Sequence, residues 1–457
     1  MPFRRFFERG AKRDTPTVED EPSADEIEAS DEELESEGGQ ESADAPGEDD
    51  EAAPEDATEI NWRERANAIL PSGASTGSKR AEALYGDPDA VGPTHYVSAS
   101  GCRVVDPAGR SYIDCTMALG SVALGYSEPD VQERVLHAIA AGNVSGLSNL
   151  YEVELAERLR DHIPCAELVQ FLKSGAEGVA AAVRIARTYT GRDLVVGSGY
   201  FGWHDWSSDA AGVPNAVRGL FRSVPFDDWN ALDQAARDAG DKLAAIVIEP
   251  VVERMPSDKW IRAARELATV FQAVLIFDEM KTGFRLRPGG YQALSGVTPD
   301  LAVFGKALAN GFPLSAVVGH RDVMDAARRT WISSTLAGES VGLAAASAVL
   351  DFHENTDLCT SLATTGQAMR AGVSAAIAAC GITGVTVDGI DPMWLLRFED
   401  RRRETRFLEL AVKHGVLFKR GAYNFAAMAH DEDTITEIEA GASAAFVELL
   451  EEEQDKT

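Results

Sequence analysis

Short, unbroken apolar runs recur between residues 117 and 352, and stretches with helical periodicity separate them. The runs include Leu194-Val195-Val196, Ala245-Ile246-Val247-Ile248 and Ala273 to Phe277, whereas Trp260 to Phe271 has a helical pattern. An unbroken apolar run suits a strand that is buried on both faces, as in a parallel sheet covered by helices. This alternation therefore predicts an α/β fold with a mostly parallel sheet.

The flanking regions differ from this central part in pattern. Pro107-Ala108-Gly109 lies between two hydrophobic runs and suggests a hairpin. Towards the end, the strand-like run Met393 to Phe398 is followed by amphipathic stretches such as Ile435 to Leu450. We therefore predict four parts: an acidic tail (1–60), an N-terminal segment (61–116), a large domain (117–352) and a smaller α+β C-terminal domain (353–450).

The acidic residues are concentrated near the start of the chain. Of the net charge of −31, residues 14–60 carry −21, because they include 21 acids and no Lys or Arg. Few large aliphatic residues lie between the acids, so we predict a disordered tail. Residues 1–9 are basic and aromatic but lack the apolar core of a signal peptide. A frayed terminus and a docking segment both stay open for them, and the tail's partner is not identified.

The five cysteines are scattered, without paired metal-ligand spacing: Cys102, Cys115, Cys165, Cys359 and Cys380. Their odd number argues against a disulfide framework, so we expect reduced thiols in a cytoplasmic protein. No apolar stretch has the length and purity of a membrane span, and the eight histidines show no ligand spacing. We expect no metal, no membrane span and no nucleic-acid partner.

One lysine, Lys306, follows the strand-like run Asp300 to Phe304 in a glycine-containing turn. A lysine has an ordinary pKa of about 10.4, so it attacks an aldehyde only from a buried or electropositive setting. A second apolar run ends at Asp278, and the carboxyl ends of strands form the ligand crevice of open α/β sheets. Separately, Lys306 could be a surface residue and Asp278 a helix cap or metal ligand; together they predict an amine and an acid at one sheet edge.

A third segment predicts an anion site. Leu168 to Leu172 has the pattern of a strand, Lys173-Ser174-Gly175-Ala176 that of a turn, and Glu177 to Tyr189 that of a helix. A helix N-terminus presents unpaired N–H groups and a positive dipole end to anions, although Ser-Gly is also an ordinary N-cap. A reactive lysine, an acid for a ring nitrogen and a phosphate site are what pyridoxal 5'-phosphate needs.

The chain from about Trp62 onward resembles the class III aminotransferases of the fold-type I pyridoxal-phosphate enzymes, most closely the glutamate-1-semialdehyde 2,1-aminomutase-like branch. The resemblance rests on motifs in the family's order: Tyr112-Ile113-Asp114, Ser174-Gly175-Ala176-Glu177, Tyr200-Phe201-Gly202-Trp203-His204-Asp205, Ile248-Glu249-Pro250, Phe277-Asp278-Glu279, Thr282-Gly283-Phe284-Arg285, Gly305-Lys306 and Ser334-Thr335. It implies that Lys306 holds the cofactor as an internal aldimine and moves the substrate's α-proton, and that Asp278 pairs with the pyridinium nitrogen.

The same resemblance implies further roles. Tyr200 would stack on the ring, the main chain of Gly175 and Ala176 would bind the phosphate with help from Ser174, and Thr335 would reach the phosphate of a neighbouring subunit. A homodimer with shared active sites follows from that last role. The chain departs from the family at Ala176, where Thr or Ser is usual, and at Phe201, where His is usual. The first departure removes a hydroxyl from the phosphate site, and the second puts substrate handling in doubt.

We predict an aminotransferase that acts on a small-molecule amino donor and a carbonyl acceptor. Residues 307–316 differ from the glycine-rich stretch of the aminomutases and are more similar to relatives linked with amino sugars or secondary metabolism. Arg80 is a candidate clamp for a substrate carboxylate, and Arg285 is either a second anion contact or half of a structural ion pair. An intramolecular aminomutase stays open, as does a catalytically silent dimeric scaffold with the tail as binding module. A nucleotide-binding enzyme is disfavoured, because the turn lacks both a P-loop lysine and dinucleotide glycine spacing.

Overall fold

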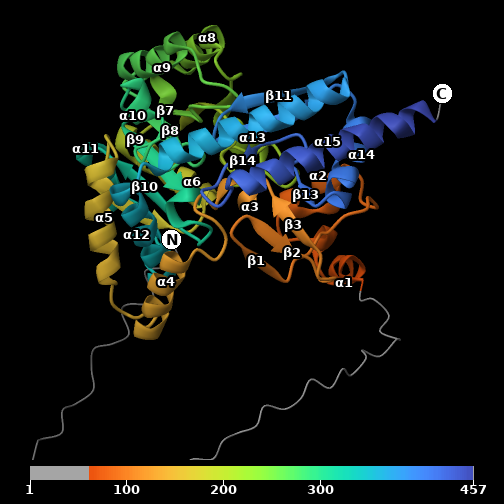
Figure 1. Cartoon of the computed structure of the whole chain (residues 1–457). Coiled ribbons are helices and arrows are strands. Elements are labelled where there is room, and N and C mark those ends of the chain that lie inside the picture. Colours follow the sequence, from red (N-terminus) through yellow and green to blue (C-terminus); the bar gives the residue numbers. More distant parts are fainter. Residues whose placement is uncertain (1–60, 456–457) are drawn as a thin grey trace, which may run out of the picture. The chain divides into compact units, whose positions relative to one another are not determined.

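A seven-stranded sheet forms the centre of the structure, a computed structural model that describes residues 61–455 (Figure 1). In spatial order its strands are β4 (Leu168–Leu172), β10 (Ser315–Gly319), β9 (Leu301–Gly305), β8 (Val274–Asp278), β7 (Leu243–Ile248), β5 (Leu194–Ser198) and β6 (Phe221–Ser223). Only β10 runs antiparallel to its neighbours, β4 and β9. The predicted mostly parallel sheet is therefore confirmed. The acidic tail lies outside the described residues, and its disorder stays a prediction.

Helices cover both faces of this sheet, because alternate side chains of each strand enter two different apolar clusters. On β8, Val274 and Ile276 pack with α6 (Gly175–Thr190), whereas Leu275 and Phe277 belong to the cluster that includes residues of α8 (Trp229–Ala239), α9 (Asp258–Val270) and α12 (Ser340–Asn355). Burial on both faces explains why these strands are unbroken apolar runs in the sequence.

Two smaller sheets complete the described part of the chain. An antiparallel sheet contains β11 (Val385–Ile390), β12 (Met393–Phe398) and β14 (Asn424–Phe425), and the long helices α13 (Leu358–Cys380) and α15 (Glu432–Gln454) lie side by side next to it (Figure 1). The other sheet contains β1 (Ser98–Ser100), β2 (Arg103–Val105), β3 (Ser111–Asp114) and β13 (Val416–Leu417). The predicted hairpin is the β2–β3 pair, and β13 joins it from the C-terminal region.

The remaining helices connect these layers: α1 (Trp62–Ile69), α2 (Ala81–Tyr85), α3 (Met117–Gly120), α4 (Pro129–Ala141), α5 (Leu150–His162), α7 (Asn215–Arg218), α10 (Gln292–Ser295), α11 (Arg321–Met324) and α14 (Arg401–Lys413). Within residues 61–455, no helix combines the length and the apolar character that crossing a bilayer requires. The described residues form one contact unit from Asn61 onward, and the borders predicted at 116 and 352 stay predictions.

The close approach of α6 to the sheet depends on a glycine. A Cβ added at Gly178 would lie 2.6 Å from Cγ1 of Val303 on β9. Val303 stands opposite Asp278 of β8 in the strand register. The absence of a side chain at Gly178 therefore brings the start of α6 next to the edge where β8 and β9 end.

We expect Gly178→Val to push α6 away from β9, because overpacking a buried contact costs about 1–3 kcal/mol. The melting temperature should fall, and binding of an anion at the start of α6 should weaken. Thr188→Val places the same residue on the solvent side of α6 and serves as the control. A Gly178→Val protein that melts like the control would contradict this account of the packing.

Candidate active site

The predicted acid and amine lie at the ends of neighbouring parallel strands. Asp278 ends β8, and Lys306 follows β9 directly, with Asp278 opposite Val303 in the register. Asp278 is buried at 4% exposure, and Lys306 keeps partial exposure. Lys306 has a φ of 50°, in the left-handed region that non-glycine residues seldom occupy. Strained backbone of this kind gathers at functional sites, so the conformation supports the prediction for Lys306.

The two groups influence each other's charge, yet no ion pair joins them among the contacts of the described residues. Burial lowers the pKa of Lys306 to about 8, and the positive charge of Lys281 acts in the same direction. Burial raises the pKa of Asp278 to about 7, with a further rise from Glu249. A neutral amine near pH 8 is a competent nucleophile. A buried acid with a raised pKa has room for a cationic partner, which would favour its ionised form.

A second charged pair lies beside this one, and the sequence did not single it out. Lys281 forms an ion pair with Glu249, and both side chains are largely buried. The Lys281 ammonium also lies 4.4 Å from the ring centroid of Tyr423, and the Glu249 carboxylate accepts a hydrogen bond from the main-chain N–H of Tyr200 at 3.4 Å. The pair thus connects four separate segments near Lys306. Its two members are 32 positions apart, so no local motif could reveal it.

The segment predicted as an anion cradle has the expected strand, turn and helix: β4 is followed by the turn at Lys173 and Ser174 and then by α6. Ser174 is the N-cap, and its hydroxyl accepts from Glu177 N, while the Glu177 carboxylate accepts from the N–H groups of Lys173 and Ser174. The Ser174 hydroxyl is therefore already engaged in this capping box. The N–H groups of Gly175 and Ala176 have no hydrogen-bond partner in the described part of the chain. They are the donors that a phosphate could use.

Close backbone packing brings the cradle, Asp278 and Lys306 together. A Cβ at Gly175 would lie 2.8 Å from Cε of Met280, and a Cβ at Gly305 would lie 2.6 Å from the same atom. Met280, two residues after Asp278, thus separates the cradle from the turn that carries Lys306. A Cβ at Gly202 would lie 2.5 Å from Cβ of Ala176, so the aromatic turn meets the cradle as well.

The two aromatic residues of that turn point in different directions. Tyr200 is 76% exposed, so its ring is available to a ligand. Phe201 is buried, with its ring 5.6 Å from that of Trp206 and 6.1 Å from that of Phe221, centroid to centroid. The departure at Phe201 therefore changes the core and not the surface that a substrate would meet.

Arg285 is fully buried and acts on the main chain. Its guanidinium donates to the carbonyl oxygens of Ala426 and Gly120, each at 2.9 Å, and lies 4.9 Å from the ring centroid of Phe425. Burial lowers the pKa of Arg285 to about 10. Both partners are main-chain carbonyls, so Arg285 forms these hydrogen bonds in place of the ion pair that the sequence suggested. They also leave Arg285 poorly placed for a second anion contact.

The carbonyl of Gly120 belongs to a left-handed turn that the sequence did not reveal. All of α3 has positive φ, from 42° at Met117 to 78° at Gly120. Left-handed geometry costs roughly 1–2 kcal/mol for each residue with a side chain, so other contacts must hold the turn. Asn310, four residues after Lys306, holds the next loop by accepting from the N–H groups of Ala123 and Leu124. Arg285 thus holds the α3 turn, and Asn310 holds the loop that follows it.

A cavity of ≈ 190 Å³ adjoins this turn. Its lining includes Lys79, Tyr112, Leu119 and Lys419. Arg80, the predicted carboxylate clamp, is not part of the lining; its Nε is buried without a hydrogen-bond partner among the described residues. Thr335, the residue predicted to reach a neighbouring subunit, lies in the exposed segment before α12.

These residues suit pyridoxal phosphate. The free N–H groups of Gly175 and Ala176 would hold the phosphate, Asp278 would pair with the ring nitrogen, and Lys306 would bind the aldehyde. No group of three or more His, Cys, Asp or Glu side chains that could hold a metal ion occurs within residues 61–455. The donor set at this edge therefore favours an organic phosphate with a cationic ring.

Comparison with known proteins identifies the class. Residues 86–198 and 223–429 match the class III aminotransferase family, and the chain belongs to that family. Pyridoxal 5'-phosphate is its cofactor, and the fold is that of the fold-type I pyridoxal-phosphate enzymes.

Two relatives and one solved structure illustrate the similarity. The chain is 35% identical over 397 residues to the 2'-deamino-2'-hydroxyneamine transaminase of Streptomyces kanamyceticus, and the alignment covers 85% of this chain and 98% of that protein. It is 35% identical over 331 residues to a glutamate-1-semialdehyde 2,1-aminomutase of Methanothermobacter thermautotrophicus, covering 68% and 76% of the two chains. The FumI protein of Sphingopyxis sp. MTA144, solved in its pyridoxal-phosphate internal aldimine form, superposes with a TM-score of 0.82 at 26% identity, covering 86% and 96%.

We expect Lys281→Met to raise the pKa of Lys306. The substitution removes a nearby positive charge and leaves Glu249 unpaired, and both changes favour the protonated amine. In the apoprotein, the midpoint of the pH profile for modification of Lys306 by an amine-reactive reagent should therefore shift to higher pH. Lys259→Met, at an exposed site on α9, is the control. A downward shift or no shift would show that Lys281 does not act on Lys306.

Proposed function

We propose that this chain is an intermolecular aminotransferase in which Lys306 and Asp278 are the catalytic residues. Bound pyridoxal phosphate supplies an aldehyde that condenses with amines and a ring that withdraws electrons. Lys306 takes the proton from the α-carbon of the amino donor and later returns a proton to the product. A pKa of about 8 suits this role, because an appreciable fraction of the amine is neutral near physiological pH.

One observation carries this proposal above all: β8 ends in Asp278 and Lys306 directly follows the neighbouring parallel strand β9, next to the free N–H groups of Gly175 and Ala176. Asp278 would keep the ring nitrogen protonated, and the exposed Tyr200 would cover one face of the ring. The Ser174 hydroxyl contributes indirectly, because its capping box fixes the turn.

The acceptor that we propose is a polar, hydroxylated carbonyl compound. The similarity to the 2'-deamino-2'-hydroxyneamine transaminase of Streptomyces kanamyceticus extends over 85% of this chain and supports this proposal. The cavity beside α3 is lined by Lys79 and Asp114, which offer a donor and an acceptor to hydroxyl groups, and by Tyr112 and Tyr126, whose hydroxyls already donate to Asp106 and Asp114. Arg80, with its unpaired Nε, is the candidate for an anionic substrate group. The aminomutase relative supports a second candidate, intramolecular transfer within one substrate.

The purified protein should be yellow, and borohydride should fix the cofactor permanently on the peptide that contains Lys306. An amino donor labelled with nitrogen-15 should convert the cofactor to its pyridoxamine form and pass the label to a different acceptor molecule. Lys306→Ala should show neither behaviour. Label that stays within a single substrate would favour an aminomutase, and a colourless protein would refute both candidates.

We expect Asp278→Asn to lower turnover by about two to three orders of magnitude, as loss of one preorganised charge typically does. Because burial raises the pKa of Asp278, its ionised form costs stability near neutral pH, so the apoprotein of the variant should melt no lower than the wild type. Asp238→Asn on exposed α8 is the control. Near-normal turnover of Asp278→Asn would refute the assigned role.

We propose a homodimer, because large apolar side chains gather on two neighbouring exposed segments. Leu147 and Leu150 are 85% and 76% exposed, and Trp331 is 83% exposed. Ser340 N donates to the carbonyl of Asn143, so these segments adjoin one another. Exposed apolar patches of this kind mark protein interfaces, and the exposed Thr335 lies between Trp331 and Ser340 in the sequence.

Leu147→Glu should place a charge in this interface and shift the protein from dimer to monomer in sedimentation analysis. Activity should fall with the dimer fraction, because the neighbour's Thr335 segment would leave the site. The control is Val270→Glu, which changes another exposed aliphatic residue, 72% exposed on α9. This variant should leave the assembly unchanged. A fully active Leu147→Glu monomer would contradict shared sites.

We also propose a cytoplasmic location. All five cysteines are free thiols, and four of them are buried, as suits a reducing compartment. The partner of the tail is left to experiment.

A further inference from the structure

An ion pair beside the phosphate cradle has no role in the chemistry above. Lys173 lies between β4 and the N-cap Ser174. Its ammonium donates to Oε1 of Glu339 at 2.6 Å and to the carbonyl oxygen of Pro313 at 3.3 Å. The Lys173 and Glu339 side chains are only 16% and 11% exposed, so water screens this pair less than a surface ion pair.

Glu339 also organises the start of α12. Its carboxylate accepts from the N–H groups of Val341 and Gly342, each at 2.9 Å. A Cβ at Gly342 would lie 2.7 Å from the Pro313 carbonyl oxygen and 3.3 Å from Nζ of Lys173, so the packing is tight. Burial alone would raise the pKa of Glu339, but the hydrogen bonds from Lys173 and Gly342 bring it below its usual value. The carboxylate therefore stays ionised.

The other end of Lys173 is fixed in the cradle. Its main-chain N–H and that of Ser174 both donate to the Glu177 carboxylate. The next two N–H groups, those of Gly175 and Ala176, are the free donors of the cradle. A displacement of Lys173 would therefore change the direction of the groups that face the phosphate.

We propose that the Lys173–Glu339 ion pair is a positioning device that joins a subunit's own phosphate cradle to the Thr335 segment that it offers to its neighbour. Thr335 lies four residues before Glu339 in an exposed stretch, and its neighbour Leu336 is 51% exposed. The inference rests on the proposed dimeric function. It implies that each ion pair supports cofactor retention at both sites of the dimer.

A double-mutant cycle in the full-length protein tests the first half of this inference. Lys173→Met and Glu339→Gln should each weaken binding of pyridoxal phosphate to the apoprotein by about tenfold, as loss of a charge-assisted hydrogen bond does. The double variant should bind pyridoxal phosphate no more weakly than the single variant that has the lower affinity. The melting temperature should fall more in the holoenzyme than in the apoprotein.

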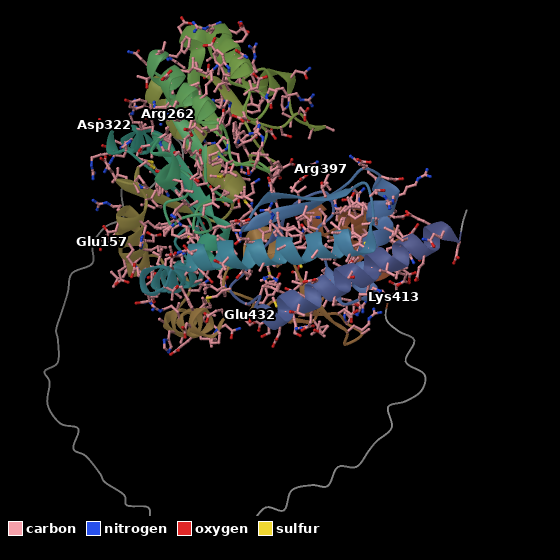
Figure 2. The ribbon with its side chains drawn as sticks, turned by 45° about the horizontal axis from the view of Figure 1, so that its top comes forward. Glu157, Arg262, Asp322, Arg397, Lys413 and Glu432 are labelled. Atoms are coloured by element: carbon pink, nitrogen blue, oxygen red, sulfur yellow. The ribbon has the colours of Figure 1, made fainter. Side chains whose placement is uncertain are left out.

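The control is Lys413→Met, which breaks a more exposed ion pair between Lys413 on α14 and Glu448 on α15; Lys413 is labelled in Figure 2. This variant should leave cofactor affinity unchanged. Affinity of Lys173→Met within about twofold of the wild type, or losses that multiply in the double variant, would overturn the inference. An equal fall of both melting temperatures would do the same, because it would make the pair merely structural.

Mixed dimers test the second half. One subunit carries Lys306→Ala and Lys173→Met, and the other is wild type, so bound cofactor reports only the wild-type site. Pyridoxal phosphate should leave this site faster than in a mixed dimer with Lys306→Ala alone. Equal rates would overturn the link between sites while leaving the proposed function intact. A wild-type protein that takes up no cofactor would overturn both.

Discussion

Desolvation of Lys306 is the interaction on which the rest of the site depends. The carboxyl ends of β8 and β9 place its ammonium where burial penalises charge, and the pKa falls to about 8. Asp278 opposes this effect, and Lys281 reinforces it. Because the interior is poorly screened, each of these neighbours has a large influence. The helices on both faces of the sheet bury the strands that carry these groups.

The sequence predicted those parts of the site that short-range patterns encode. β8 and β9 are apolar runs, β4 has a strand pattern interrupted by Gln170, and Ser174 with Gly175 is a recognisable N-cap, so the edge that carries Asp278 and Lys306 could be located. β10 was not foreseen, because its five residues give no sign of running antiparallel. The Lys281–Glu249 pair, the left-handed α3 and the carbonyl partners of Arg285 depend on contacts between distant segments. No local pattern encodes such contacts.

The two departures from the family acquire physical reasons. At Ala176, the aromatic turn packs closely, since a Cβ added at Gly202 would lie 2.5 Å from the Cβ of Ala176. A phosphate bound at the start of α6 would rely on the main-chain N–H groups of Gly175 and Ala176. At Phe201, an apolar ring fills a space between Trp206 and Phe221, where a histidine would bury unsatisfied nitrogens. Both changes leave Tyr200, Asp278 and Lys306, the residues that we propose for contact with the cofactor ring, unchanged.

The pairing of β13 with β3 has a consequence for biosynthesis. Val416 stands opposite Ile113, about 300 residues earlier in the chain. A ribosome adds roughly 5–20 residues per second, so β3 emerges on the order of 15–60 s before its partner is made. During that interval its outer edge has unpaired N–H and C=O groups, which invite association with other nascent chains. Chaperone protection of the growing polypeptide would matter most in this window.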